Sequence, residues 1–297
     1  MSQPFFARIE PIQTMADGTV KQLNPFSGTE VWTVPGRGNR PLSKPAENPQ
    51  PLAEGAATST CAFCADRRLE TPPEKSRILA SGEILRGVQP GQLWETDPMF
   101  RRVPNLFEIV SYDYWSQNYG YDVDSYTAER MAAYLAVPEG REHVLNVVRT
   151  RRKAAGKDPN LSDDELLARA NGFFGGGHDV IVGKRHFVDG AENNSQLASS
   201  GTLTPDEHYL LTSFTADSMR DLYERNRYAS YVVAFQNWLA PAGASFEHLH
   251  KQLVAIDDRG MNSQREVQMQ RGNPNMYNEW AVDYAAQHNL VIAENDY

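Results

Sequence analysis

The sequence predicts a mixed α+β fold from three observations. Short runs of β-branched and aromatic residues, such as "HDVIVGKRHF" and "SYVVAFQNW", are typical of strands. Longer segments that begin at a capping residue and carry an apolar face at helical spacing are typical of helices. Helices lie among the strands without a fixed alternation, and short turns join them, so the fold class is α+β.

Composition indicates a soluble globular protein. Of the 297 residues, 40% are hydrophobic and 23% are charged, and 38 acidic residues against 29 basic ones give a net charge of -9. Phosphate backbones attract basic surfaces, so nucleic acid is not expected as the main partner. No run approaches the about 20 apolar residues of a membrane span, and the first residues lack a secretory signal. We therefore expect a cytoplasmic protein without a membrane partner.

The first 115 residues are expected to hold strands and long loops. Residues 1–60 are rich in proline and glycine and contain one strand-like run, "EVWTVP", followed by a loop-like arm at 40–59. Aromatic and β-branched residues dominate from 91 to 115, which predicts strands in that segment.

Capping residues mark several of the helices that follow. We predict helices at 125–136, 141–156, 161–172, 204–226 and 278–289. Ser162 is the expected N-cap of the third helix. Thr204 caps the fourth, with Pro205 at its first position and Glu207 completing a capping box. We predict the remaining strands at 178–187, 230–238 and 248–256, with a last strand opening at 290.

The two cysteines, Cys61 and Cys64, stand three apart in "CAFC". A disulfide is disfavoured in a reducing compartment. Two thiolates at this spacing can grip Zn²⁺, but a tetrahedral site needs two more ligands, usually histidines. A redox pair would stand at the start of a helix after an apolar strand, and the flanks "GAATST" and "ADRRLETPPEK" do not suit that arrangement. Half of a zinc site is the favoured interpretation, with redox and inert thiols left open.

Histidines could complete such a site, although a single histidine is more often an ordinary surface or hydrogen-bonded residue. The candidates are His178, His186, His208, His248 and His250. Two of them, His248 and His250, alternate with Gln252 in "HLHKQ", and an extended strand sends alternate side chains to one face. A polar strand edge is the competing interpretation.

The turn "APAGAS" before these residues could admit a phosphate group. Gly243 keeps the backbone accessible and Ser245 adds a hydroxyl. A neutral imidazole beside the turn could attack phosphorus. A glutamine such as Gln252 can orient phosphate oxygens but cannot donate a proton as an acid. The pattern therefore favours holding a nucleotidyl intermediate over hydrolysing it.

Taken in order, these motifs resemble the galactose-1-phosphate uridylyltransferase family, the nucleotidyltransferase branch of the histidine-triad superfamily. The matching segments are "NPFSGTEVWTVPGRGNRP", "CAFC" followed by "TPPE", "RRVPNLF", "GGGHDVIVGKRH" and "VVAFQNWLAPAGASFEHLHKQLVAI". The resemblance implies a zinc-stabilised, histidine-triad-like fold, with a mostly antiparallel sheet and flanking helices.

The resemblance also assigns roles to residues. It implies that zinc is bound by Cys61, Cys64, His186 and His248. It implies that His250 is the nucleophile and that Gln252 holds the phosphate. The substrate contacts that it implies are Arg37, Arg40, Asn105, Asn237, Gly243 and Ser245. One departure is Glu247, which places a carboxylate beside the motif where the family usually has a neutral residue.

The activity implied by the resemblance is nucleotidyl transfer through a nucleotidyl-histidine. Uridylyl transfer between a nucleotide sugar and a sugar 1-phosphate comes first. An ADP-sugar or dinucleoside-polyphosphate phosphorylase is one alternative, and a catalytically inactive zinc-containing nucleotide-binding protein is another. The expected partners are the nucleotide sugar and the sugar phosphate, and a homodimer is left open.

The resemblance covers the first half of a fold that the family builds from two halves. We therefore expect one uridylyltransferase-like domain over residues 1–297, with a helical insertion at 115–172. The family's second half is expected to be absent after about residue 290, which would make this chain a truncated form.

Overall fold

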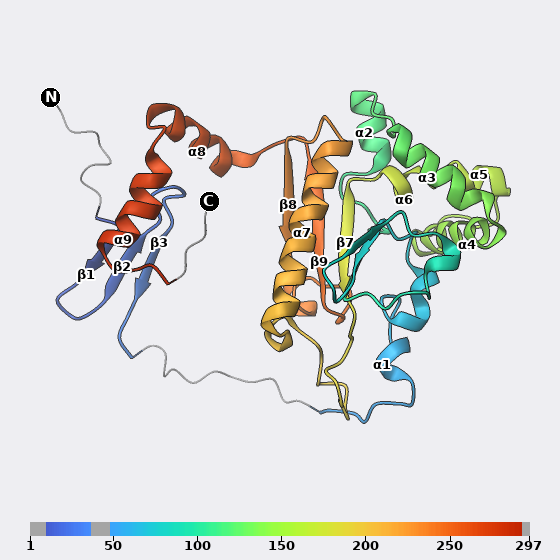
Figure 1. Ribbon diagram of the computed structural model, residues 1–297, viewed down its shortest axis with the longest axis horizontal. Helices are drawn as coiled ribbons and strands as arrows, with labels where there is room; N and C mark the ends of the chain where they lie inside the picture. Colours follow the sequence, from blue (N-terminus) through green and yellow to red (C-terminus); the bar gives the residue numbers. More distant parts are fainter. Residues whose placement is uncertain (1–9, 37–47, 293–297) are drawn as a thin grey trace. The chain divides into compact units, whose positions relative to one another are not determined.

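The computed structural model describes residues 10–36 and 48–292 (Figure 1). These residues cluster into two compact units. The larger unit spans residues 47–258, and the smaller combines residues 1–46 with 259–297. Each unit has its own sheet.

A six-stranded antiparallel sheet is the frame of the larger unit. Its spatial order is β5-β4-β6-β7-β9-β8, and each neighbouring pair is antiparallel. The strands are β4 (Ser76–Ile78), β5 (Ile84–Arg86), β6 (Phe100–Pro104), β7 (His178–Gly183), β8 (Tyr231–Phe235) and β9 (His250–Ile256). The antiparallel sheet with flanking helices confirms the predicted α+β class.

Helices of two kinds accompany this sheet. The α-helices are α1 (Ala56–Ser59), α2 (Tyr112–Tyr119), α3 (Ser125–Ala136), α4 (Pro138–Ala154), α5 (Asp163–Leu167), α6 (Asn171–Gly175) and α7 (Pro205–Arg225). The 3-10 helices are η3 (Ala65–Glu70), η4 (Pro90–Gln92), η5 (Ser200–Thr202) and η6 (Ala240–Ala242).

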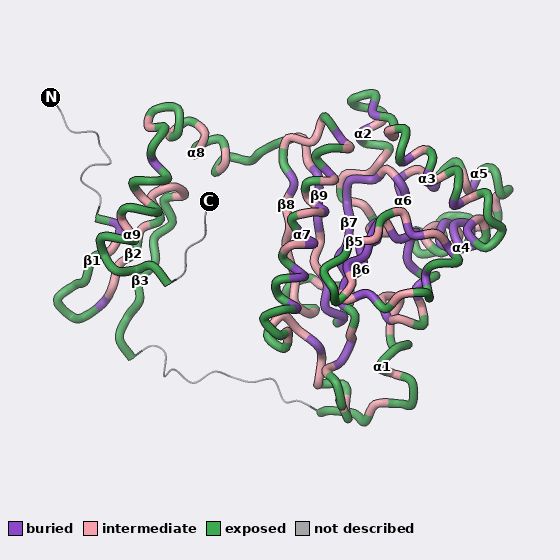
Figure 2. Tube along the Cα trace, in the orientation of Figure 1, coloured by how far each residue is buried: buried purple, intermediate pink, exposed green. Residues whose placement is uncertain are grey.

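The longest helix, α7, covers one face of the sheet and begins where the sequence predicts. The Thr204 hydroxyl accepts a hydrogen bond from the backbone N–H of Glu207, and the Glu207 carboxylate accepts one from the N–H of Thr204. Its apolar stripe, which includes Phe214 and Leu222, packs into the main core with Ile181 and Leu253 of the sheet. Figure 2 shows the buried positions that run along β7 and β9.

Residues pointing to the opposite face of the sheet follow from the strand register. Val180 lies opposite both Val103 and Gln252, and Val182 lies opposite His250. Residues directly opposite each other in an antiparallel pair share a face. His250 and Gln252, the residues of the "HLHKQ" motif on β9, therefore share a face with these valines, and α7 does not cover that face. Arg101, opposite Val182, lies on the same face.

A second apolar core holds the helical segment together. Val144, Val148, Leu166 and Phe173 are among its buried members. The segment starts near the predicted boundaries: α3 matches residues 125–136, and α5 begins after Ser162, whose hydroxyl caps it. The helix predicted at 161–172 is instead two short helices, α5 and α6.

The smaller unit packs helices beside a three-stranded sheet. Its elements are β1 (Ile12–Thr14), β2 (Val20–Leu23), β3 (Glu30–Thr33), α8 (Gly260–Gly272), the π-helix η7 (Asn278–Asp283) and α9 (Tyr284–Gln287). Arg265 of α8 donates to the carbonyl of Ser27, and Phe26 packs on Tyr277. Contacts between residues far apart in sequence thus hold this unit together.

Two strand predictions differ from the structure. Of residues 91–115, only β6 is a strand, because the remaining aromatic residues enter turns and α2. Residues 290–292 are not in a strand, and the rest of the strand predicted there lies outside the described residues. Within residues 10–36 and 48–292, no helix has both the length and the apolar character of a membrane span.

Candidate functional site

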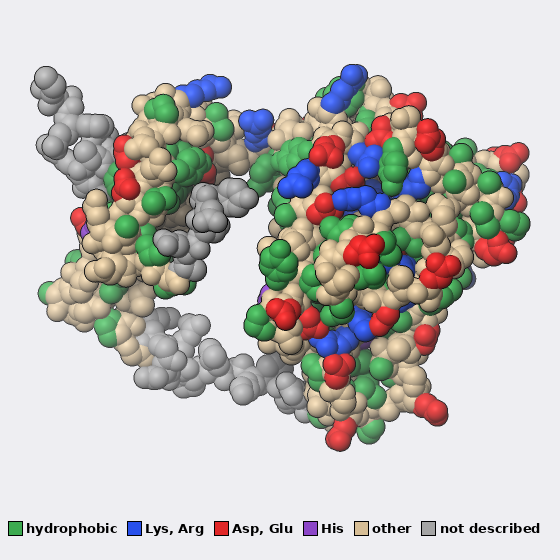
Figure 3. Space-filling model, in the orientation of Figure 1, with side chains coloured by type: hydrophobic (Ala, Val, Ile, Leu, Met, Phe, Trp, Pro, Cys, Tyr) green, Lys and Arg blue, Asp and Glu red, His purple; other side chains and the backbone are tan. Residues whose placement is uncertain are grey.

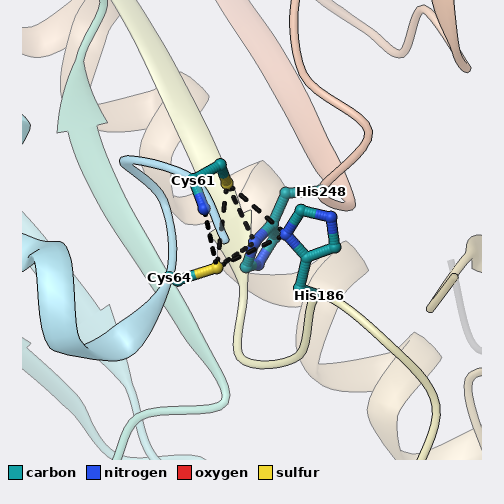
Figure 4. Close-up of side chains that lie close together, drawn as sticks. All are labelled: Cys61, Cys64, His186 and His248. Atoms are coloured by element: carbon teal, nitrogen blue, oxygen red, sulfur yellow. Dashed lines mark hydrogen bonds between the residues drawn. The ribbon is translucent and has the colours of Figure 1, made fainter. Parts of the chain in front are cut away.

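Four side chains of the larger unit converge on one point (Figure 4). They are Cys61, Cys64, His186 and His248, and their ligand atoms all lie within 4.8 Å of one another. The two sulfur atoms are 3.8 Å apart. Nδ1 of His186 lies 3.5 and 3.3 Å from the sulfur atoms of Cys61 and Cys64, and Nδ1 of His248 lies 3.7 Å from each.

These distances fit the edges of a tetrahedron around one metal ion. With zinc–sulfur bonds of about 2.3 Å and zinc–nitrogen bonds of about 2.0 Å, sulfur atoms should lie about 3.8 Å apart and sulfur and nitrogen about 3.5 Å apart. The observed separations lie within about 0.3 Å of these values. The cluster can hold a metal ion, and the donor set of two thiols and two imidazoles suits zinc.

Three separate segments deliver the ligands. A tight turn, in which the N–H of Cys64 donates to the carbonyl of Cys61, brings the two thiols together ahead of η3. His186 follows the end of β7, and His248 precedes the start of β9. Nε2 of His248 donates to the carbonyl of Gly183 over 2.7 Å, which leaves Nδ1 facing the thiols.

A hydrogen bond between the two thiols shifts their pKa values in opposite directions. The hydrogen bond from the Cys61 thiol lowers the pKa of Cys64, and the same contact raises the pKa of Cys61. The thiolate of Cys64 is thus stabilised by the thiol of Cys61. A bound cation would ionise both thiols, because a metal ligand must be deprotonated.

His250, two residues after His248, points elsewhere. Its Nδ1 donates to the carbonyl of His248 over 2.7 Å, so the neutral ring carries its proton on Nδ1 and has a lone pair on Nε2. Burial lowers the pKa of His250, which favours the neutral ring. The ring lines a cleft of about 440 Å³.

The cleft brings together several residues that the sequence singled out. Its lining includes Asn105, Gly243, Ser245, His250 and Gln252. The polar groups are set among apolar side chains, as in most small-molecule sites. Gly243 has a φ of 87°, a left-handed conformation that suits glycine and turns the chain at the edge of the cleft.

Other predicted contacts fall outside this lining. Asn237 lies beside the turn, with Nδ2 3.9 Å from the point a Cβ on Gly243 would occupy. Arg37 and Arg40 lie outside the described residues. Glu247 is exposed and is not among the residues that line the cleft.

His178 orients the glutamine. Its Nδ1 accepts a hydrogen bond from the backbone N–H of Ile109 over 3.0 Å, so the ring proton sits on Nε2. Nε2 lies 3.0 Å from Oε1 of Gln252 and 3.0 Å from Nδ2 of Asn105. Of these two groups, Gln252 offers the acceptor, so its oxygen is bound to His178 and its NH₂ group is left to serve as a donor.

Sequence reasoning considered His178 as a metal ligand or a turn residue and missed this role. No local signal gives it, because the partners come from residues about 70 positions away. Phe63, inside "CAFC", was also missed. Its ring lines the cleft and lies 4.4 Å from the ring of Phe246 and 5.5 Å from that of His250. An aromatic residue between two metal ligands was the available signal.

Two solved structures resemble the chain. An ADP-glucose phosphorylase from Arabidopsis thaliana, with bound ADP-glucose, is 15% identical at a TM-score of 0.45, with 91% of this chain and 57% of that chain covered. A GalT-like protein from Arabidopsis thaliana is 15% identical at a TM-score of 0.40, with 75% and 48% covered. This chain spans about half the length of each. Both TM-scores lie below 0.5, so neither likeness carries an argument about activity.

Family membership rests on a match along most of the chain. No curated protein matches the sequence. A described family covers residues 15–297, which include the whole larger unit and both cysteines. The chain belongs to the family described as "Domain of unknown function (DUF4921)".

Proposed function

We propose that the protein is a nucleotidyltransferase that carries a nucleoside monophosphate on His250. One observation carries the proposal: His250 donates through Nδ1 to the carbonyl of His248, which leaves Nε2 unprotonated, and its ring lines a cleft together with Gln252, Gly243 and Ser245. This is the arrangement of a nucleophile held in one tautomer beside groups that can bind phosphate oxygens.

The proposed reaction proceeds by two displacements. Nε2 of His250 attacks the α-phosphorus of a nucleotide sugar, a nitrogen–phosphorus bond forms, and the bond to the leaving sugar 1-phosphate breaks. The proton stays on Nδ1, where the His248 carbonyl supports the positive charge of the ring. An oxygen of the phosphorylated acceptor then attacks phosphorus, and the electron pair returns to Nε2. Because the leaving group is a phosphate, no general acid is needed.

The other residues of the cleft receive supporting roles. The NH₂ group of Gln252, oriented by His178, donates to a phosphate oxygen. Ser245 and the backbone at Gly243 contact the same phosphate, and Asn105 approaches the nucleoside. Asn237, Arg37 and Arg40 complete the proposed substrate contacts. A zinc ion on Cys61, Cys64, His186 and His248 would act as a structural cross-link that fixes the carbonyl of His248 under the ring of His250.

Uridylyl transfer between a nucleotide sugar and a sugar 1-phosphate is the first choice, from the resemblance of the motifs. Adenylyl transfer to phosphate, or phosphorolysis of a dinucleoside polyphosphate, uses the same first step and is the runner-up. A nucleotide-binding protein without catalysis is the contrasting possibility. Hydrolysis is disfavoured, because Gln252 supplies no proton to a leaving group.

Covalent labelling tests the proposal. The zinc-loaded protein is incubated separately with UDP-glucose and ADP-glucose, each labelled in the α-phosphate, and protein-bound label is measured. We expect acid-labile label that is stable in base, as a phosphoramidate should be, and loss of the label on addition of glucose 1-phosphate. Binding of both nucleotides without any covalent label would favour the non-catalytic alternative.

A further inference from the structure

A second cleft, of about 570 Å³, lies in the helical segment. It is bounded by the loop that precedes α2 and by the ends of α4, α5 and α6. Four cationic side chains line it, namely Arg151, Arg152, Lys157 and Arg169. Leu106 and Phe107 line both this basic cleft and the cleft of His250, so the two are neighbours.

None of these four cations forms a direct ion pair within the described residues. In the part of the chain that the structure describes, none has a carboxylate oxygen within 4.0 Å. Three of them donate to backbone carbonyls instead: Arg151 to that of Arg169, Arg152 to that of Asp158, and Arg169 to that of Glu165. Arg151 also lies over the ring of Phe173, at 5.0 Å.

Other arginines of α4, outside the cleft, form ion pairs with acidic residues. Arg141 and Arg149 of α4, which do not line the cleft, pair with Asp163, at 3.6 and 3.0 Å. Acidic residues are therefore within reach of α4, yet they gather around the arginines outside the cleft. The two arginines of this helix that have no acidic partner among the described residues, Arg151 and Arg152, line the cleft.

Helix ends do not account for the whole charge. Arg151 and Arg152 occupy the last turn of α4, where cations are favoured, and Arg169 follows α5. Each helix end contributes at most about -0.5 charge, so two ends offset about one cation of the four. Asp113 also lines the cleft and offsets another. Positive charge remains even with these groups counted.

Glu108 is the remaining acid in the lining. Its Oε2 accepts a hydrogen bond from the N–H of Tyr112 and lies against Gly172. Its Oε1 is buried against Gly176 without a hydrogen-bond partner in the described residues. Burial raises the pKa of Glu108 to about 7. This carboxyl group is thus only partly ionised at neutral pH and adds little negative charge.

We propose that the basic cleft binds a small molecule through two or more of its phosphate groups. Arginine forks are suited to phosphate oxygens, and guanidinium groups already anchored on backbone carbonyls lose little freedom on binding. The site is distinct from the cleft of His250, and the two share a wall. The proposal goes beyond the proposed function and does not depend on turnover.

Calorimetric titration with inorganic tripolyphosphate tests the proposal. The wild-type chain is compared with R152Q/R169Q, which removes two cleft cations, and with R141Q/R149Q, which removes the same charge from outside the cleft. We expect the cleft variant to bind roughly tenfold more weakly or more, and the control within about twofold of wild type. Affinity should also fall with added salt.

Each result of the titration either supports or overturns binding in the cleft. If R152Q/R169Q binds as wild type does, the anion sits elsewhere, for example at the His250 turn, and the proposal is wrong. If both variants weaken binding equally, only overall charge matters and the proposal is also wrong. A third variant, A168E, adds a carboxylate to the lining without removing an arginine. It should weaken binding as well, and it guards against a folding defect in the double variant.

Discussion

Both faces of the large sheet contain buried polar groups. The two faces differ in whether those groups are all paired with each other or are also available to a metal ion or a ligand. On the face beneath α7, Asp179 pairs with Lys75 and Arg102 at 2.7 and 2.6 Å, and Arg102 also pairs with Asp221. Each of these charges has a partner from the chain. The opposite face has paired charges as well, because Glu74 pairs with Arg77 and Arg101. It also carries the cluster of two thiols and two imidazoles, and the ring of His250, which lines a cleft.

The difference separates polar groups that stabilise the fold from polar groups that could bind a metal ion or a substrate. Removing one partner from a buried network of paired charges leaves an uncompensated charge and is strongly destabilising. A cluster of two thiols and two imidazoles can instead bind a metal ion, and under the proposed function the histidine that lines the cleft reacts with a substrate. On the face drawn in Figure 3, exposed acidic and basic side chains of the larger unit lie among one another. The basic cleft belongs with the groups that could bind a ligand.

The largest effect on stability is expected from the buried charge network around Asp179. D179N keeps the shape of the side chain but leaves Lys75 without its partner in the core, so we expect a loss of about 4 kcal/mol in the free energy of unfolding. D217N removes the carboxylate of the partly exposed pair with Arg86 and should cost less than about 1 kcal/mol. Urea denaturation of both variants measures the two losses in the free energy of unfolding. Equal losses would mean that the buried network stabilises the protein no more than an exposed ion pair does.

Metal removal should give the next largest effect. A strong chelator is expected to lower the free energy of unfolding of the wild type by about 3 kcal/mol, the linkage expected for an ion present at a few hundred times its dissociation constant. The variant C61S/C64S should start lower and not respond to the chelator. Protein purified without added metal should contain about one zinc per chain by elemental analysis. A chelator response that survives in the variant would place the metal elsewhere.

Glu108 should make stability depend on pH. Its folded pKa of about 7 lies above its ordinary value of 4.5, so the folded state binds the proton more tightly. Stability is therefore highest below pH 4.5 as far as this group is concerned, and it falls as pH rises towards 7. E108Q removes the ionisable group, so the difference in free energy of unfolding between E108Q and wild type should shift by about 3 kcal/mol in favour of E108Q between pH 4.5 and pH 8. Thermal denaturation at both pH values measures it, and a pH-independent difference would contradict the assignment.

A smaller effect, on the rate of nucleotidyl transfer, is expected from His178. H178F removes the donor that fixes Oε1 of Gln252, so the amide can turn either way towards the phosphate. We expect roughly a tenfold slower formation of the labelled intermediate, equivalent to about 1.4 kcal/mol, with zinc content unchanged. A rate equal to that of wild type would show that Gln252 is oriented by other groups.

The sequence predicted the elements whose causes are local. The caps at Ser162 and Thr204 located their helices within a few residues, because a cap depends only on the next three or four positions. The spacing of Cys61 and Cys64 similarly indicated half of a metal site. In contrast, the strands predicted between 91 and 115 were mostly wrong, because aromatic residues pack equally well in turns and helices when a core is nearby.

Features built from distant segments could not be predicted from the residues alone. Spacing left five histidines as candidate ligands, and the resemblance, not a physical argument, selected His186 and His248. The structure separates them because, of the five, these two place a ring nitrogen near both sulfur atoms. The tautomer of His178 depends on a backbone N–H at Ile109, and the basic cleft depends on how α4 and α5 end together. Neither has a signature along the chain.

The central claim is that two neighbouring histidines divide the work, with His248 on the metal and His250 on the nucleotide. Zinc content and acid-labile label from α-labelled UDP-glucose or ADP-glucose are to be measured side by side in H248A and H250G. The account predicts that H250G keeps about one zinc per chain and takes up no label, whereas H248A loses zinc. Label on H250G, or full zinc retention in H248A, would contradict it.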